Sequence, residues 1–388
     1  MPAPVSNHIQ KRPDILQYLR APERVTLAKI LSLAVSVVFA LFILDAAVFR
    51  THLYGRFLEP SSYLGDFETS LRIGRETPFK KPHHALVLGD SQIGEGFSSR
   101  VADEAGADAG WEFVNVAVGG AAMRSLYYLD RDVDPDRNRF DAVVLPLHGY
   151  PDVDDGEVRA DRELDLRWMI ARLRLSDIPD FAASFPTRSV RMDVIRESLF
   201  EGLVYRRDFR ELLRHYAKRM RDIEACRAAC AESSYAYSGR TEDLSGLWMD
   251  WATNTIHYPP GASEQVQYEM KLHTNFRDWS VRGIEGAYRK AWLGRIIDRY
   301  RGTRTRIVIV PLPYRPFPIP LSWPIDSNSF IVQASKNPGV AIVDEHLFDD
   351  LQRPELFFDV FHLNKKGRDL YSSRLAAAII QRVEGGAR

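Results

Sequence analysis

The sequence predicts an α/β protein, a three-layer sandwich with a central parallel sheet, a helical insertion and one N-terminal transmembrane helix. Short apolar runs rich in β-branched residues alternate with helix-like segments, which is typical of parallel strands covered on both faces. A charged, helix-like region interrupts this alternation, and one long apolar stretch lies near the N-terminus. The 52 basic residues balance the 52 acidic residues, so no nucleic-acid partner is expected.

The apolar stretch covers residues 30–49 and reaches the roughly 20 residues that a helix needs to cross a bilayer. Basic residues predominate before it, so the positive-inside rule predicts a cytoplasmic tail at 1–29. The rest of the chain is then periplasmic, tethered to the inner (cytoplasmic) membrane, and Asp45 can reach the outer interface. The alternatives are a signal peptide cleaved near Ala46 and Ala47, although its leader is long, and a buried core helix.

The main domain is predicted to span 83–388, after a stalk or packing arm at 50–82. Its expected strands are the apolar runs at 85–91, 112–120, 140–150, 306–313 and 339–348. Helical patterns separate the strands at 98–105, 121–131, 281–300 and 366–383. Residues 152–280 are predicted as a helical insertion at the carboxyl edge of the sheet, where open α/β sheets bind ligands.

Gly89-Asp90-Ser91 ends the first predicted strand, and Gly94 follows three residues after the serine. Glycine permits a tight turn that lifts a serine out of the sheet. The helix that follows offers its N-terminal N–H groups to an anion. Alone, the motif also fits a simple helix N-cap.

A second motif lies near the C-terminus, where Asp359 and His362 are three residues apart. If the segment turns helically, both side chains lie on one face. The carboxylate can then hold the imidazole in one tautomer while its other nitrogen faces a hydroxyl group. Alone, the pair also fits a surface ion pair or a helix cap.

Together, the motifs resemble the SGNH (GDSL) hydrolase family, whose sequence blocks occur in the same order. The resemblance rests on GDSQIGEG at 89–96, NVAVGGAAM at 115–123 and DVFHLN at 359–364. It covers about 84–151 and 305–383, and it implies an SGNH or flavodoxin-like fold.

The resemblance also implies the roles of individual residues. Ser91 is then the nucleophile, His362 its general base and Asp359 the acid that orients the histidine. The backbone N–H groups of Ser91 and Gly120, with Gly119 as the alternate, are implied as oxyanion-hole donors. No cofactor and no metal are expected.

One block departs from the family pattern, which usually reads Gly-x-Asn-Asp after a strand. Here the strand ends in LPLHGYPDVDD, with His148 and Tyr150 where the Gly and Asn are expected. Either side chain could donate to an oxyanion, or the strand end has no catalytic part. Because losing one oxyanion donor typically costs ~10²–10³-fold in rate, the change concerns efficiency more than reaction type.

The membrane anchor adds a second resemblance, to the single-anchor SGNH proteins of polysaccharide O-acetylation and teichoic-acid D-alanylation systems. It implies an O-acyltransferase or esterase that forms an acyl-serine intermediate, acting on an envelope or secreted glycan. A polytopic membrane-bound O-acyltransferase is the implied partner. The alternatives are a membrane-tethered carbohydrate or lipid esterase that uses water, and a non-catalytic scaffold whose triad is not assembled.

Aromatic residues of the insertion, Trp248, Trp251 and Tyr258, are candidates for a sugar-binding platform or for the insertion's own core. Cys226 and Cys230 lie one helical turn apart, and the sequence leaves open a disulfide at a helix end or two free thiols.

Three further patterns are interpreted without a functional role. The acidic cluster at 152–155 lacks the spacing of a calcium loop and is expected to be a solvated loop. His83, His84 and His346 lack ligand spacing for a metal. The proline-rich segment 311–324 is expected to be a stiff loop beside the active site.

Overall fold

The structure is a computed structural model. It describes residues 27–51, 53–147, 150, 165, 168–253, 255–273, 283–318 and 329–385. Most of the predicted cytoplasmic tail, His148, the acidic cluster at 152–155 and part of the proline-rich segment lie outside these residues.

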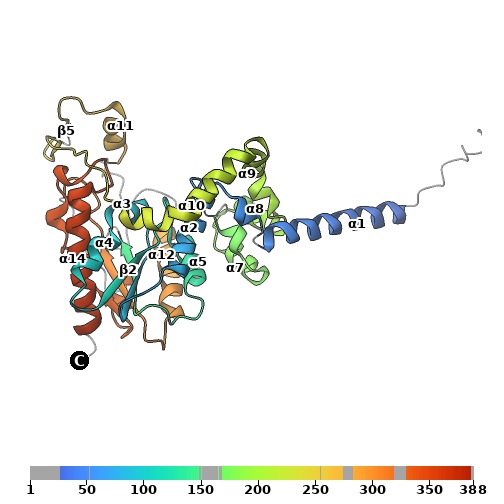
Figure 1. Ribbon diagram of the computed structural model, residues 1–388, viewed down its shortest axis with the longest axis horizontal. Coiled ribbons are helices and arrows are strands. Elements are labelled where there is room, and N and C mark those ends of the chain that lie inside the picture. The colour runs from blue at the N-terminus through green and yellow to red at the C-terminus, as the bar shows by residue number, and fades with distance from the viewer. Residues whose placement is uncertain are drawn as a thin grey trace, which may run out of the picture.

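The central sheet has five parallel strands in the order β2-β1-β3-β6-β7 (Figure 1). These strands are β1 (His83–Val87), β2 (Trp111–Asn115), β3 (Ala142–Leu147), β6 (Arg306–Pro311) and β7 (Val340–Ile342). Counted along the chain, the order is 2-1-3-4-5, one of the common orders of doubly wound sheets. The predicted α/β class with a parallel central sheet is confirmed. The strands are shorter than the apolar runs, because each run continues into the turn at the carboxyl edge.

Both faces of the sheet are buried, which explains why the strands read as continuous apolar runs rather than alternating ones. Leu86 of β1 and Val143 of β3 belong to one core cluster, whereas their neighbours Val87 and Val144 belong to the other. The first face is covered by α2 (Tyr63–Glu76), α5 (Met123–Val133) and α12 (Gly283–Arg299). The second is covered by α3 (Ser91–Gly96), α4 (Ser99–Ala105) and α14 (Lys365–Glu384).

The N-terminal helix α1 (Leu27–Asp45) projects away from this body (Figure 1). It continues through a π-helical turn, η2 (Ala46–Arg50), and an 18-residue window of the combined segment has a mean hydropathy of 2.6 with no residue buried. Within the described chain, this is the one helix that is long and apolar enough to cross a membrane. The alternative of a buried core helix is therefore wrong.

The described chain between β3 and α12 forms two groups of elements joined by a long helix. The first group lies beside the end of α1 and comprises η4 (Ile170–Arg172), η5 (Leu175–Asp177), α7 (Ile178–Ala183), α8 (Arg188–Leu199) and α9 (Gly202–Arg214). The second comprises an antiparallel hairpin, β4 (Trp248–Asp250) and β5 (Thr255–His257), and α11 (Glu264–His273). Helix α10 (Tyr216–Ala236) connects them and packs across α2 and α4.

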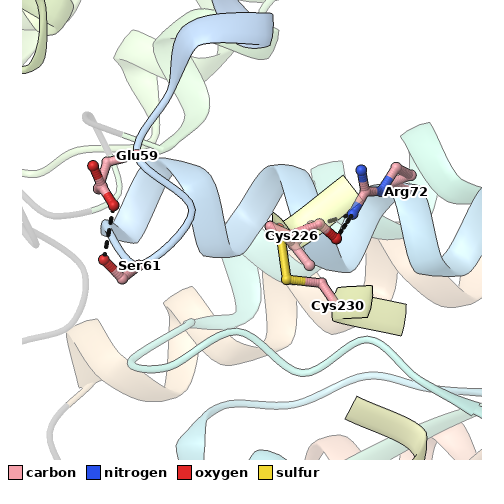
Figure 2. The surroundings of a disulfide bond; sticks show 6 residues. Glu59, Ser61, Arg72, Cys226 and Cys230 are labelled. Atoms are coloured by element: carbon pink, nitrogen blue, oxygen red, sulfur yellow. Dashed lines mark hydrogen bonds between the residues drawn. A yellow bond between two sulfur atoms is a disulfide. The ribbon is translucent and has the colours of Figure 1, made fainter. Parts of the chain in front are cut away.

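The two cysteines form a disulfide within α10 (Figure 2). This settles the question that the sequence left open, and it places the bond inside the helix rather than at its end. The remaining short elements are η3 (Tyr54–Phe57), α13 (Phe330–Ala334), η7 (Asp349–Leu351) and η8 (Pro354–Leu356).

Candidate active site

Ser91 lies at the carboxyl edge of the sheet because of a tight turn between β1 and α3. A side chain at Gly89 is excluded, since its Cβ would lie 2.5 Å from the Ile93 side chain. Asp90 caps the helix by accepting a hydrogen bond from the Gln92 N–H at 2.9 Å. Ser91 is therefore the first residue of α3, where N–H groups have no acceptor within the helix. The motif is a helix N-cap and also presents a hydroxyl group.

Asp359 and His362 lie in a loop between η8 and α14, so the helical turn considered as one way to bring them together does not occur. An antiparallel bridge between Phe357 and Leu363 closes the loop. Within it, Asp359 Oδ1 accepts hydrogen bonds from the N–H groups of Phe361 and His362, at 2.9 and 2.8 Å. This Asx-type turn, rather than a helix, brings together two side chains that are three residues apart in the sequence.

Ser91, His362 and Asp359 form one hydrogen-bonded chain. His362 Nε2 lies 2.9 Å from Ser91 Oγ, across 271 positions of sequence. His362 Nδ1 lies 2.8 Å from Asp359 Oδ2 and 2.9 Å from Oδ1. With Nδ1–H donating to the carboxylate, Nε2 is left as the acceptor for the serine hydroxyl proton. This is the geometry of an activated serine nucleophile.

The pKa values of the pair are shifted in opposite directions. Burial opposes the charge on Asp359, but hydrogen bonds from the His362 ring and two backbone N–H groups hold its pKa below the ordinary value. Burial also disfavours charge on His362, yet the hydrogen bond and charge of Asp359, with Asp90 and Glu95, raise its pKa above the ordinary value. A carboxylate that stays ionised thus supports a more basic imidazole.

Contacts within the loop and from outside it hold the histidine in place. Phe358 stacks on the His362 ring with centroids 5.6 Å apart, and Gln92 donates to the Phe361 carbonyl at 3.3 Å. The segment after α10 also contacts the loop, because the Leu244 N–H reaches the Phe357 carbonyl at 3.1 Å. The insertion therefore supports the base, which no sequence motif indicated.

The predicted oxyanion glycine lies in a turn beside the nucleophile. The Val118 N–H donates to the Gly89 carbonyl at 3.0 Å, and the Ala121 N–H closes the turn on the Val118 carbonyl at 2.9 Å. Gly120 is the third residue of this turn and has φ +76°. A type II β-turn requires a positive φ at that position, which glycine adopts readily. The Gly119 N–H instead donates to Asp66 Oδ2 at 3.3 Å, which removes Gly119 as the alternate donor.

The same loop is held by α2, which sequence reasoning missed. Besides Asp66, Ser70 donates to the Ala117 carbonyl at 3.1 Å. Burial raises the pKa of Asp66, although the Gly119 N–H opposes this shift. Part of the predicted stalk or packing arm therefore packs against the body and holds the loop that contains Gly120. No signal in the sequence links α2 to residues some fifty positions later.

The prediction that Tyr150 donates to an oxyanion is wrong. Its side chain is 3% exposed, and its hydroxyl group donates into the sheet, 2.6 Å from the Val343 carbonyl and 3.3 Å from that of Ile309. A tyrosine combines an apolar ring with a polar hydroxyl group. In Tyr150 the ring is buried and the hydroxyl group bonds to backbone carbonyls inside the protein. His148 lies outside the described residues.

The three candidate platform aromatics differ in their surroundings. Trp248 is 53% exposed and stacks on His257 across the β4–β5 hairpin, with ring centroids 3.7 Å apart. Trp251 packs edge-on against Phe317, and Tyr258 donates to the Gln267 carbonyl at 3.2 Å. Trp251 thus packs the insertion against the segment after β6, Tyr258 bonds within the insertion, and Trp248 alone of the three is largely exposed.

Among the described residues, no group of three His, Cys, Asp or Glu side chains is placed to hold a metal ion. No protein-family model matches the chain, and no curated protein matches it. The interpretation of this site therefore depends on the side-chain geometry and on the residue types that form it.

Proposed function

We propose that this protein is a membrane-anchored, extracytoplasmic serine enzyme that transfers an acyl group through an acyl-Ser91 intermediate. The hydrogen-bonded chain Ser91–His362–Asp359 is the observation that carries the proposal. Three sequence blocks in family order and the 2-1-3-4-5 strand order support an SGNH-like fold for the domain. The exposed apolar helix α1 supports the anchor.

The chemistry follows from the positions of the protons. Ser91 Oγ attacks the acyl carbonyl carbon while His362 Nε2 takes its proton. The N–H groups of Ser91 and Gly120 stabilise the tetrahedral oxyanion, and Asp359 stabilises the imidazolium. The leaving alcohol then takes the proton from His362, and the acyl group remains as a serine ester. Water or an acceptor hydroxyl attacks that ester, again with His362 as base, and Ser91 regains its proton.

We propose O-acetylation of an envelope or secreted polysaccharide as the reaction. A domain tethered outside the membrane is placed to receive acyl groups from a polytopic membrane-bound O-acyltransferase and to meet glycan hydroxyls. The exposed Trp248 ring supports a sugar acceptor, because pyranose rings stack on flat aromatic faces. Ester hydrolysis uses the same three residues and is the competing reaction. A non-catalytic scaffold requires an unassembled triad, and the 2.9 Å contact between His362 and Ser91 argues against it.

The test uses the full chain in nonionic detergent with p-nitrophenyl acetate, with and without an oligosaccharide acceptor. We expect acetyl release that falls by about 10⁶-fold in Ser91→Ala and His362→Ala. His346→Ala is the matched control, because His346 also contacts an aspartate three residues away, Asp349, but is exposed. Wild-type turnover in the Ser91 and His362 variants would overturn the proposal. Acetylated oligosaccharide exceeding free acetate selects transfer, and the reverse selects hydrolysis.

A further inference from the structure

A second site lies between η3, α2 and α10, away from the triad. A cavity of about 460 Å³ opens there, and neither Ser91 nor His362 lines it. Its walls are unusually rich in one residue type. Five arginines line it, namely Arg56, Arg72, Arg75, Arg172 and Arg227. Two glutamates, Glu68 and Glu76, are the acidic residues of the lining, so the cavity carries an excess of positive charge.

The pairing of these side chains leaves that excess uncompensated. Arg172 is buried and pairs with Glu68, which accounts for one charge of each sign. Arg72 donates to the Cys226 carbonyl at 3.3 Å, and Arg227 donates to the Arg56 carbonyl at 3.4 Å. These acceptors are neutral. In the described part of the chain, no carboxylate lies within ion-pairing distance of Arg56, Arg72, Arg75 or Arg227.

The disulfide helps to fix one wall of the cavity. Cys226 lines it, and Figure 2 shows Arg72 of α2 reaching across to Cys226 of α10, where the bond to Cys230 begins. A cross-link within one helical turn restricts the backbone whose carbonyl orients Arg72. A second cavity, of about 480 Å³, shares Arg72, Glu76 and Arg227 but is also lined by Asp103 and Glu112, so the excess of positive charge belongs to the first cavity.

We propose that this cavity binds a phosphate group, and that its source is the headgroup of an anionic phospholipid. Guanidinium groups match phosphate oxygens in geometry and keep their charge at any physiological pH. Arg56 lies six residues after Arg50, which ends the apolar segment. At the maximum reach of an extended chain, the two residues are no more than about 20 Å apart. The choice of a lipid as the source rests on the proposed membrane anchor. The proposal that the cavity binds phosphate rests on its charged lining and is independent of the anchor.

The experiment uses the full chain in nonionic detergent and two kinds of probe. Inorganic pyrophosphate is titrated by calorimetry, and phosphatidylglycerol and phosphatidylcholine are compared by native mass spectrometry. We expect phosphatidylglycerol to bind at least tenfold more tightly than phosphatidylcholine. Arg72→Ala/Arg227→Ala should weaken phosphatidylglycerol binding at least tenfold. The control, Arg214→Ala/Arg301→Ala, removes the same charge from exposed ion pairs with Glu211 and Asp298 and should bind as wild type.

Each outcome decides a part of the proposal. Pyrophosphate that binds as tightly as phosphatidylglycerol, with both lost in the cavity variant, supports the phosphate site and overturns the lipid source. Binding that the cavity variant and the control weaken equally would overturn the site, because only general charge would then matter. Arg227→Ala alone, at an exposed position, keeps the test valid if the double variant fails to fold, as monitored by circular dichroism. Acetyl release reports separately on the proposed acyl chemistry.

Discussion

Two aspartates in different regions of the molecule accept hydrogen bonds from pairs of backbone N–H groups but have different partners. In the loop beside Ser91, Asp359 accepts from the N–H groups of Phe361 and His362. At the end of the apolar helix, Asp45 accepts from the N–H groups of Glu201 and Gly202, at 2.9 and 2.8 Å. The first carboxylate also accepts a hydrogen bond from an imidazole, whereas the second caps the start of α9 and joins the apolar helix α1 to the insertion.

The carboxylates of the two regions also differ in the direction in which their pKa values are shifted. The His362 ring and the backbone N–H groups outweigh burial and lower the pKa of Asp359. Beside Asp45, burial raises the pKa of Glu201 to about 7, although the Arg50 guanidinium 3.2 Å away opposes the shift. In the proposed mechanism the Asp359 carboxylate supports proton transfer by His362, while Asp45 and Glu201 join α1 to the insertion. Substituting Asp359 should therefore change the reaction rate, whereas substituting Asp45 should change the local stability of the junction.

The largest effect is expected for Asp359→Asn. The amide keeps the size of the side chain but favours the wrong imidazole tautomer, so kcat should fall by about 10⁴-fold. Asp45→Asn is the matched change at the junction and should leave kcat within about twofold. Rates with p-nitrophenyl acetate measure both variants. Equal losses in the two would show that Asp359 acts only through folding.

The pH profile is the next most sensitive measurement. His362 must be neutral to accept the serine proton, and its pKa is raised by Asp359 despite burial. Activity should therefore fall about tenfold per pH unit as pH drops below that raised pKa, with its midpoint above the ordinary value of 6.5. Asp359 stays ionised throughout, since its pKa is lowered. A midpoint below 6.5 in kcat/KM would contradict this electrostatic coupling.

Asp45→Asn should instead loosen the junction. An amide presents one acceptor oxygen and an NH₂ group to two N–H donors, which costs about 1–3 kcal/mol locally. Hydrogen exchange at Glu201 and Gly202 should accelerate, while exchange in α3 stays unchanged. Unaltered protection at Glu201 and Gly202 would mean that Asp45 contributes nothing to the attachment of α9.

The smallest effect is expected for Tyr150→Phe. Removing a hydroxyl that donates to the Val343 carbonyl should cost about 1 kcal/mol of stability and leave kcat unchanged. Denaturant unfolding and acetyl release measure the two quantities. A rate loss of ~10²-fold would restore Tyr150 to the oxyanion hole.

The parts predicted from the sequence depend on contacts between near neighbours. The turn at Gly89, the cap at Asp90 and the spacing of Asp359 and His362 all act within a few residues. The meeting of Ser91 with His362 followed from a family resemblance, and the parallel sheet explains it, because the carboxyl ends of its strands share one edge.

The parts that were missed depend on contacts between distant segments. Asp66 reaches Gly119 across 53 positions, and Asp45 reaches Gly202 across 157. Neither pair has a local pattern, because each hydrogen bond joins segments that are far apart in the sequence. Tyr150 was misassigned for a related reason, since a tyrosine after a strand can turn its hydroxyl either into the sheet or out of it.

Covalent labelling of Ser91 tests the activation of the serine most directly. A fluorophosphonate reacts with an activated serine by forming an Oγ–P bond and releasing fluoride, and peptide mass spectrometry locates the adduct. We expect labelling of Ser91 in the full chain and in His346→Ala, and its loss in His362→Ala. An unlabelled Ser91 in the native chain, or equal labelling without His362, would contradict an imidazole-activated nucleophile.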